Sequence, residues 1–110
     1  MSNPRYRNGH RRREVQAYYR ARRAACYICG RPIDYSRRPP DPWSFVVDET
    51  VAIANGGRVC KANSGPAHRW CNAVKGTHTL EWARAEVKRR LAGGKPAAAP
   101  KPRDFEAADW

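Results

Sequence analysis

The sequence predicts a small α+β domain with a helix at each end of a compact middle segment. With 110 residues, the chain has the length of a single domain. Three stretches support this class: an uninterrupted helical pattern at Arg11–Arg23, a run of aromatic and β-branched residues at Trp43–Glu49, and a periodic apolar pattern at Leu80–Leu91. Only 41% of the residues are hydrophobic, so we expect part of the chain to lack a packed structure.

The charge of the chain points to a polyanionic partner. Lys and Arg total 22 against 10 Asp and Glu, a formal net charge of +12 at pH 7. This excess argues against a small-molecule enzyme and favours nucleic acid or an anionic membrane surface. No apolar run approaches the roughly 18–20 residues of a membrane-spanning helix. The N-terminus also lacks the apolar core of a signal peptide, so we expect a cytoplasmic protein.

The first quarter of the chain is expected to form a basic helix. Residues 1–25 contain eight arginines and one acid, more than half of the total excess charge. The helical stretch has no Pro or Gly, and its candidate apolar stripe consists of Val15, Tyr18 and Tyr19. Arginine suits bidentate contacts with phosphate, although a solvated arm that only keeps the protein in solution is the alternative. The candidate nucleic-acid-binding residues are Arg11, Arg12, Arg13, Arg20, Arg22 and Arg23.

Two pairs of metal-binding residues flank the middle of the chain. Cys26 and Cys29 are followed by Gly30, so both thiolates can face one ion while the glycine lets the backbone reverse. His68 and Cys71 repeat the two-residue spacing farther along. Together they supply the four ligands that a tetrahedral structural zinc requires, as a Cys3His set. In a reducing cytosol, metal binding explains such cysteines better than disulfides do.

Cys60 is the alternative fourth ligand, in place of His68. It has no paired neighbour and lies in a short strand-like stretch, Arg58–Cys60, where a buried thiol is a sufficient interpretation. We therefore expect Cys60 to lie outside the zinc site. A redox role for Cys26 and Cys29 is disfavoured, because no βαβ pattern surrounds them.

The segment between the two pairs predicts two strands and a helix. Trp43–Glu49 is expected to be the first strand, because β-branched and aromatic residues favour sheets. A Gly-Gly loop, the strand-like stretch that ends at Cys60 and a polar turn that holds Asn63 follow. Ala67 to about Lys75 then suits a helix that opens after a proline and closes at a glycine.

This order brings two acids and two amides into one unit. Asp48 and Glu49 end the predicted strand, while Asn63 lies in the turn and Asn72 on the predicted helix. Carboxylate and amide oxygens are hard ligands that suit Mg²⁺ or Mn²⁺, and such an ion beside a phosphate stabilises the leaving oxygen. A second carboxylate can accept a proton from the attacking water. The alternative is that the acids begin a solvated loop and the asparagines belong to ordinary turns.

The chain is expected to end in a helix, a linker and a short tail. Thr79 is the candidate N-cap of Leu80–Leu91, whose apolar side chains share one face. Gly93–Pro102 reads as a flexible linker, and the acidic tail either folds back, binds a partner or stays disordered. The predicted parts are an Arg-rich arm at 1–25, a zinc-stabilised domain at 26–91, and the linker and tail at 92–110.

The order and spacing of these motifs resemble those of the small HNH endonucleases of bacteria and their phages. The likeness covers about residues 24–83 and rests on Cys26-x-x-Cys29-Gly-Arg-Pro-Ile-Asp34-Tyr35, Val47-Asp48, Gly56-Gly57 and Asn63-x-x-Pro-Ala-His68-x-x-Cys71-Asn72-x-x-Lys75-Gly76. The resemblance implies a treble-clef-like ββα-metal fold with a structural Zn²⁺. It also implies a hydrolase that uses a catalytic Mg²⁺ or Mn²⁺ to nick or cut DNA.

The resemblance assigns a role to each matching residue. Asp48 matches the carboxylate that binds the catalytic ion, and Asn72 matches a second ligand of that ion. Asn63 matches the central asparagine, which braces a loop and orients the general base. The structural zinc ligands are matched by Cys26, Cys29, His68 and Cys71.

Glu49 departs from the family's pattern, which usually has its first histidine, the general base, at this position. A glutamate is ionised at neutral pH and can accept a proton, so Glu49 is the candidate base. A role as a second metal ligand and a loss of activity are the alternatives. His10 and His78 are disfavoured as replacement bases, because both are expected to be exposed.

Two functions stay open from the sequence. The first is a metal-dependent endonuclease whose arginine-rich arm holds the DNA backbone and whose catalytic residues are Asp48, Glu49, Asn63 and Asn72. The second is a zinc module without catalytic activity that binds nucleic acid or helps to assemble a phage packaging complex. In both cases the resemblance implies a protein encoded by a phage or prophage and located in the cytoplasm of a bacterial host.

Overall fold

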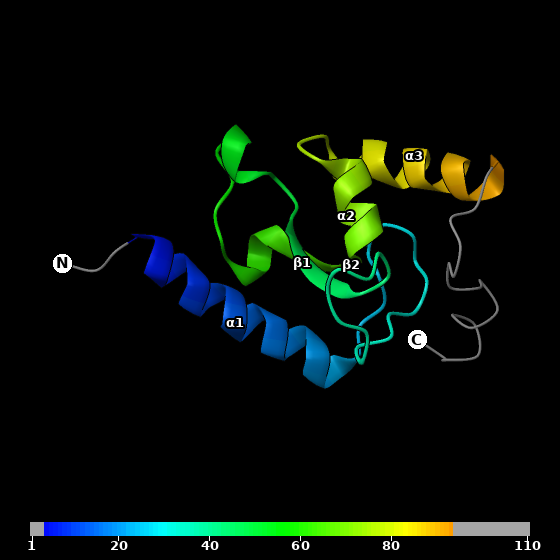
Figure 1. Cartoon of the computed structure of the whole chain (residues 1–110). Helices are drawn as coiled ribbons and strands as arrows, with labels where there is room; N and C mark the ends of the chain where they lie inside the picture. The colour runs from blue at the N-terminus through cyan, green and yellow to red at the C-terminus, as the bar shows by residue number, and fades with distance from the viewer. Residues whose placement is uncertain (1–3, 94–110) are drawn as a thin grey trace.

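The computed structural model describes residues 4–93, which form a small α+β fold (Figure 1). Within these residues, three α-helices accompany one two-stranded antiparallel sheet, so the predicted class is confirmed. The predicted linker and tail beyond Gly93 lie outside the described residues. None of the helices in the described part is long and apolar enough to cross a membrane. The elements are α1 (Pro4–Arg22), β1 (Phe45–Glu49), the short 3-10 turns η1 (Ile53–Asn55) and η2 (Lys61–Asn63), β2 (Ser64–His68), α2 (Arg69–Lys75) and α3 (Leu80–Gly93).

Helix α1 begins earlier than the sequence predicted. The pattern placed its start at Arg11, whereas the helix begins at Pro4 and passes through Gly9. Proline is tolerated at this first position because its missing N–H would have no partner inside the helix. A glycine in a helix interior destabilises it by only about 1 kcal/mol relative to alanine, which the rest of this long helix can offset. Arg23, with a φ of 48°, marks the end of the helix.

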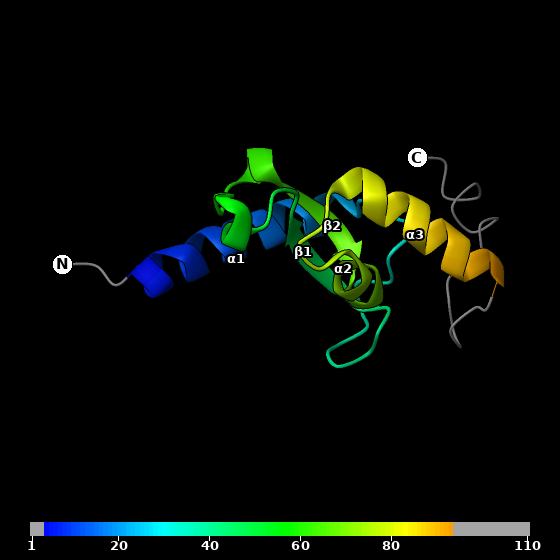
Figure 2. The same cartoon turned by 90° about the horizontal axis from the view of Figure 1, so that it is seen from above.

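The predicted apolar stripe of α1 faces the sheet. Val15 is buried, and the Tyr19 hydroxyl donates a hydrogen bond of 3.1 Å to the backbone oxygen of Ser64 on β2. Tyr18 is half-buried and stacks on Tyr19, with ring centroids 5.2 Å apart. Helix α1 therefore lies alongside the sheet, as Figures 1 and 2 show from two directions.

The second strand lies later in the chain than predicted. Arg58–Cys60 forms no strand, and β2 is instead Ser64–His68. Sequence propensities do not predict this strand, because Gly65 and Pro66 both disfavour sheets. The helix predicted from Ala67 accordingly begins two residues later, as α2.

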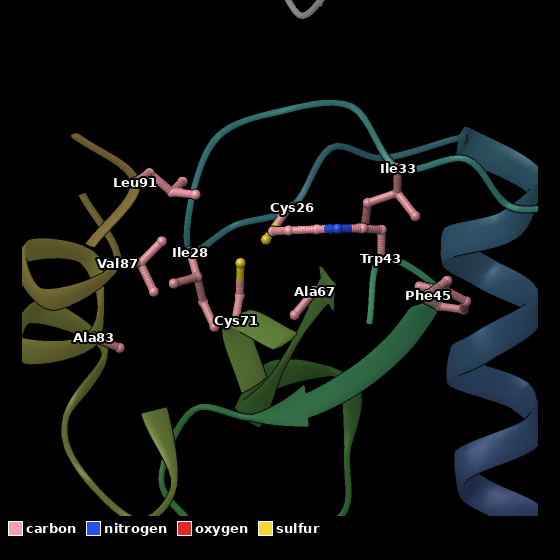
Figure 3. Close-up of a cluster of buried hydrophobic side chains, with 10 residues drawn as sticks. All are labelled: Cys26, Ile28, Ile33, Trp43, Phe45, Ala67, Cys71, Ala83, Val87 and Leu91. Carbon is pink, nitrogen blue, oxygen red and sulfur yellow. The ribbon is translucent and has the colours of Figure 1, made fainter. Parts of the chain in front are cut away.

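The core lies between the Cys26–Cys29 turn, the sheet and α3 (Figure 3). Trp43 is only 1% exposed and precedes β1, which is shorter than the predicted Trp43–Glu49. The predicted apolar face of α3 is confirmed, since it buries Ala83, Val87 and Leu91. The predicted cap is confirmed as well, because the Trp82 N–H donates to Thr79 Oγ1 at 3.1 Å.

Gly65 provides a test of the packing against β2. A Cβ atom at this position would overlap the ring of Tyr27. We expect Gly65→Ala to lower the free energy of unfolding by about 1–3 kcal/mol, measured by denaturant titration, because overpacking forces the backbone or ring to move. Gly9→Ala is the control: its Cβ would lie 3.7 Å from an Arg13 side-chain nitrogen, an ordinary contact. Equal stability of the two variants would contradict the packing.

Candidate functional site

Four metal-binding side chains converge from three parts of the fold. Cys26 and Cys29 come from the turn after α1, His68 ends β2, and Cys71 lies on α2. Their ligand atoms all lie within 4.8 Å of one another, and three of the four residues are buried. Ligands around a tetrahedral zinc with bonds of about 2.3 Å lie about 3.8 Å apart, so a small inward movement suffices. This group could therefore hold a metal ion such as zinc, as the spacing predicted.

The ring of His68 is oriented from both sides. Its Nε2 lies 3.1 Å from the carbonyl oxygen of Pro32, which can accept a hydrogen bond from an Nε2–H. Its Nδ1 faces the thiols, 3.4 Å from Cys29 Sγ and 3.8 Å from Cys71 Sγ. The edge of the Trp43 ring packs against the imidazole. A backbone carbonyl on the outer nitrogen is the usual partner of a metal-binding histidine, so Nδ1 is the nitrogen available to a metal.

Among the three thiols of this group, the electrostatics favour one charged thiolate, and the neighbouring thiols stay protonated. Burial raises the pKa of Cys26, but hydrogen bonds from Cys29, Cys71 and His68 outweigh it and hold that pKa well below its ordinary value. The pKa of Cys29 is raised to about 12, first by its hydrogen bond with Cys26. Several thiolates cannot lie this close together without a cation between them. A divalent ion would supply that positive charge.

Cys60 lies outside this group, as the sequence predicted. It is half-buried rather than buried, in the bend just before η2. All four cysteines of the chain are free thiols. The Cys3His set is therefore the arrangement that the structure favours over a set with Cys60.

Asp48 is held from two sides at the end of β1. It is 5% exposed, and its Oδ2 accepts a short hydrogen bond from the Tyr27 hydroxyl. Lys75 Nζ lies 3.3 Å from the same oxygen and donates to the backbone oxygen of Glu49 at 3.0 Å. Burial raises the pKa of Asp48 despite the opposing effects of Tyr27 and Lys75. Both of these contacts engage Oδ2.

Tyr27 connects the metal-binding turn to Asp48. It lies between Cys26 and Cys29, and its backbone N–H donates to the oxygen of Pro66 on β2 at 2.8 Å. Its ring occupies the space above Gly65 and carries the hydroxyl to the carboxylate. This role of Tyr27 is not predictable from the sequence, because a tyrosine inside a Cys-x-x-Cys turn has no spacing signal of its own.

Glu49 is paired with a residue of the arginine-rich arm. Its side chain is 17% exposed, and its Oε1 lies 3.1 Å from Arg12 Nη2 and 3.4 Å from Arg12 Nε. Glu49 also faces Ser64 in the register of the sheet. The prediction treated Arg12 as a nucleic-acid contact only, whereas the structure gives it a carboxylate partner within the protein.

Asn63 braces the loop that follows β1. Its Oδ1 accepts a hydrogen bond from the Val51 N–H at 2.9 Å. Its Nδ2 donates to the oxygens of Val51 and Arg58, at 3.0 and 2.9 Å. A Cβ at Gly57 would overlap the Val51 carbonyl, so this close approach requires glycine. The side chain thus holds together the two ends of the loop, the position that the resemblance implied for the central asparagine.

Asn72 lies on α2 next to Cys71 and three residues before Lys75. Residues three apart share a helix face, and Lys75 on that face reaches Asp48. Asn72 is half-buried there. The structure therefore places Asp48 and Glu49 at the end of β1 and Asn63 at the loop after it, while Asn72 lies on α2 three residues before the lysine that reaches Asp48.

The two histidines that were disfavoured as bases are exposed, as expected. His10 Nε2 lies 2.6 Å from Glu14 on α1. His78 stacks on Trp82, with ring centroids 3.8 Å apart. Neither histidine contacts Asp48 or Glu49 through a hydrogen bond or ion pair within the described residues.

The six arginines predicted to bind nucleic acid differ in their contacts within the protein. Arg12 is paired with Glu49, and Arg20 donates to the oxygen of Tyr35 at 3.2 Å while it lies over the Phe45 ring. These two side chains help to attach α1 to the rest of the fold. Among the described residues, no carboxylate pairs with the exposed side chains of Arg11, Arg13, Arg22 and Arg23.

No family model, curated protein or solved structure matches the chain.

If the Cys3His group binds zinc, variants of its residues should differ from a variant of Cys60 in zinc content and in thermal stability. Cys29→Ala and His68→Ala should lose bound zinc and the cooperative thermal transition, because the free energy of binding a structural metal is part of the free energy of folding. Cys60→Ala removes the same thiol group outside the cluster and should keep both properties. The measurements are metal content by mass spectrometry and melting by circular dichroism. Loss of zinc in Cys60→Ala with retention in His68→Ala would contradict the ligand set.

Proposed function

We propose that this chain is a metal-dependent HNH endonuclease that hydrolyses phosphodiester bonds in DNA. The observation that carries the proposal is the position of Asp48 and Glu49 at the end of β1, against α2 and beside a loop that Asn63 braces. The net charge of +12 supports a polyanionic substrate. The Cys3His group could hold the structural metal that the resemblance implies, through residues of the same compact unit.

The residues around Asp48 fit a weakly held divalent ion. Asp48 Oδ1 and the amide oxygen of Asn72 are hard ligands of the kind that Mg²⁺ and Mn²⁺ prefer. Lys75 and Arg12 offset the charges of Asp48 and Glu49, so these four side chains have no net charge. Mg²⁺ is commonly held by one or two protein oxygens together with water and substrate phosphate, so we expect the ion to bind mainly with DNA. When bound, it would stabilise the charge that develops on the leaving oxygen.

Each side chain then has a distinct task. Glu49 Oε2, which Arg12 does not contact, accepts the proton of the attacking water, while Arg12 holds the carboxylate through Oε1. Tyr27 and Lys75 fix Asp48. Asn63 keeps the loop closed, so that the end of β1 keeps its position.

The second candidate function is nucleic-acid binding without cutting, alone or within a phage packaging assembly. It is favoured by the same two ion pairs, because Lys75 and Arg12 already satisfy both carboxylates. The two functions differ in one observable. Only the nuclease converts supercoiled plasmid to nicked or linear DNA with Mg²⁺ or Mn²⁺.

Asp48→Asn tests the proposed ion ligand. The substitution keeps the size of the side chain but removes its charge, so we expect plasmid nicking to be lost while zinc content is unchanged. Asp34→Asn is the matched control, since Asp34 is exposed and bonds to nearby Ser36 and Arg37. Wild-type nicking by Asp48→Asn would contradict the ion site. A wild type that binds DNA but shows no metal-dependent nicking would instead establish the second function.

Glu49→Gln tests the proposed base. Glutamine keeps the shape but cannot take the proton, so we expect nicking to fall by about 10²–10⁴-fold, the usual contribution of a positioned base. Glu49→His should retain activity, because imidazole can accept the proton. Glu81→Gln on α3, an exposed glutamate, serves as the control. Full activity of Glu49→Gln at ordinary metal concentration would exclude the base role, and rescue by additional Mn²⁺ would indicate a metal ligand.

A further inference from the structure

A basic groove lies between α1 and the turn that precedes β2. Its volume is about 460 Å³, and its lining includes Arg11, Tyr18 and Arg22 from α1 with Cys60 and Lys61 from the turn. These two segments are far apart in the sequence and lie side by side in both views of the fold (Figures 1 and 2). The groove is separate from the zinc group and from the end of β1.

Two cations in this groove share one aromatic ring. The guanidinium carbon of Arg22 lies 3.6 Å from the centroid of the Tyr18 ring, and Lys61 Nζ lies 4.3 Å from it. The ring face attracts each cation, but the two positive charges repel each other. Tyr18 is itself held in place by stacking on Tyr19. The aromatic pair therefore gathers cations from two segments at one place.

The positive charge of the groove is only partly neutralised from within. Its lining contains three cations and one acid, Glu14, whose carboxylate lies 2.6 Å from His10 Nε2. Among the described residues, no carboxylate forms an ion pair with Arg11, Arg22 or Lys61. This differs from Arg12, whose charge Glu49 offsets. An anion in the groove would relieve the repulsion among its three cations.

We propose that this groove binds a backbone phosphate of DNA, with Arg11, Arg22 and Lys61 as its contacts and Tyr18 as the platform that aligns them. The proposal rests on the proposed function for the identity of the polyanion. It adds Lys61 and Tyr18 to the predicted binding residues. It also separates Arg11 and Arg22, which line the groove, from Arg12 and Arg20, which hold α1 to the fold.

The groove is placed to fix a strand relative to the candidate active site. Tyr19, which stacks on Tyr18, bonds to Ser64, and Ser64 lies opposite Glu49 in the sheet. Lys61 begins the η2 turn that ends at Asn63. A phosphate in the groove is thus connected by a few rigid contacts to the carboxylates at the end of β1.

The experiment compares two double variants of equal charge. Arg22→Gln/Lys61→Gln removes two contacts in the groove, and Arg13→Gln/Arg23→Gln removes two exposed charges elsewhere on the arm. Affinity for a duplex oligonucleotide is measured against salt concentration without added divalent ions, after zinc content and melting confirm that both variants fold. The groove variant should flatten the log–log slope by about 1.8, since each phosphate contact contributes about 0.9. The control should change it by less than half as much.

Equal slopes in the two variants would overturn the proposal, because they would show a diffuse charge effect. A parallel titration with inorganic phosphate distinguishes a site for free anions: saturation by phosphate together with unchanged DNA binding in the groove variant would also overturn it. Failure of the proposed function is a different result. A wild type that never nicks DNA refutes the nuclease, whereas this binding test is made without the catalytic ion and is unaffected.

Discussion

The Cys26, Cys29, His68 and Cys71 group is the constraint on which the rest of this fold depends. It ties the turn after α1 to the end of β2 and the start of α2, segments that a two-stranded sheet could not hold together alone. The core around it contains few large aliphatic side chains, and small domains of this kind usually need a metal or a disulfide for stability. His68 ends β2 and Cys71 lies on α2, so a metal ion bound by both would connect these two consecutive elements.

A single residue connects the Cys3His group to the candidate active site. Tyr27 lies inside the metal-binding turn and bonds to Asp48, while Lys75 approaches that carboxylate from α2. These contacts hold Asp48 rigidly, but the positive charges of Lys75 and Arg12 reduce the attraction of the site for a free cation. In the nuclease that we propose, a substrate phosphate would add negative charge at this place, so the divalent ion would bind together with DNA rather than alone.

Features with a local signature were predictable from the sequence, and features made by distant contacts were not. The Cys3His set, the α3 face and its Thr79 cap follow from spacing within short segments. Strand β2 could not be predicted because Gly65 and Pro66 both have low propensity for sheets. Its formation is explained only by its pairing with β1 and its contact with Tyr27. The partners of Asp48 and Glu49 could not be predicted because they are distant in the chain. Tyr27 lies 21 positions from Asp48, and Lys75 and Arg12 lie 26 and 37 positions from Glu49. Those separations leave no periodic signal.

The most direct test of this account is zinc K-edge X-ray absorption on the full-length chain, combined with its metal content. We predict one zinc per chain, with three sulfur ligands at about 2.3 Å and one nitrogen ligand at about 2.0–2.1 Å. A shell of four sulfurs would place Cys60 in the site instead of His68. That result, or a folded chain without zinc and with oxidised cysteines, would contradict the constraint from which the positions of Tyr27, Asp48 and α2 follow.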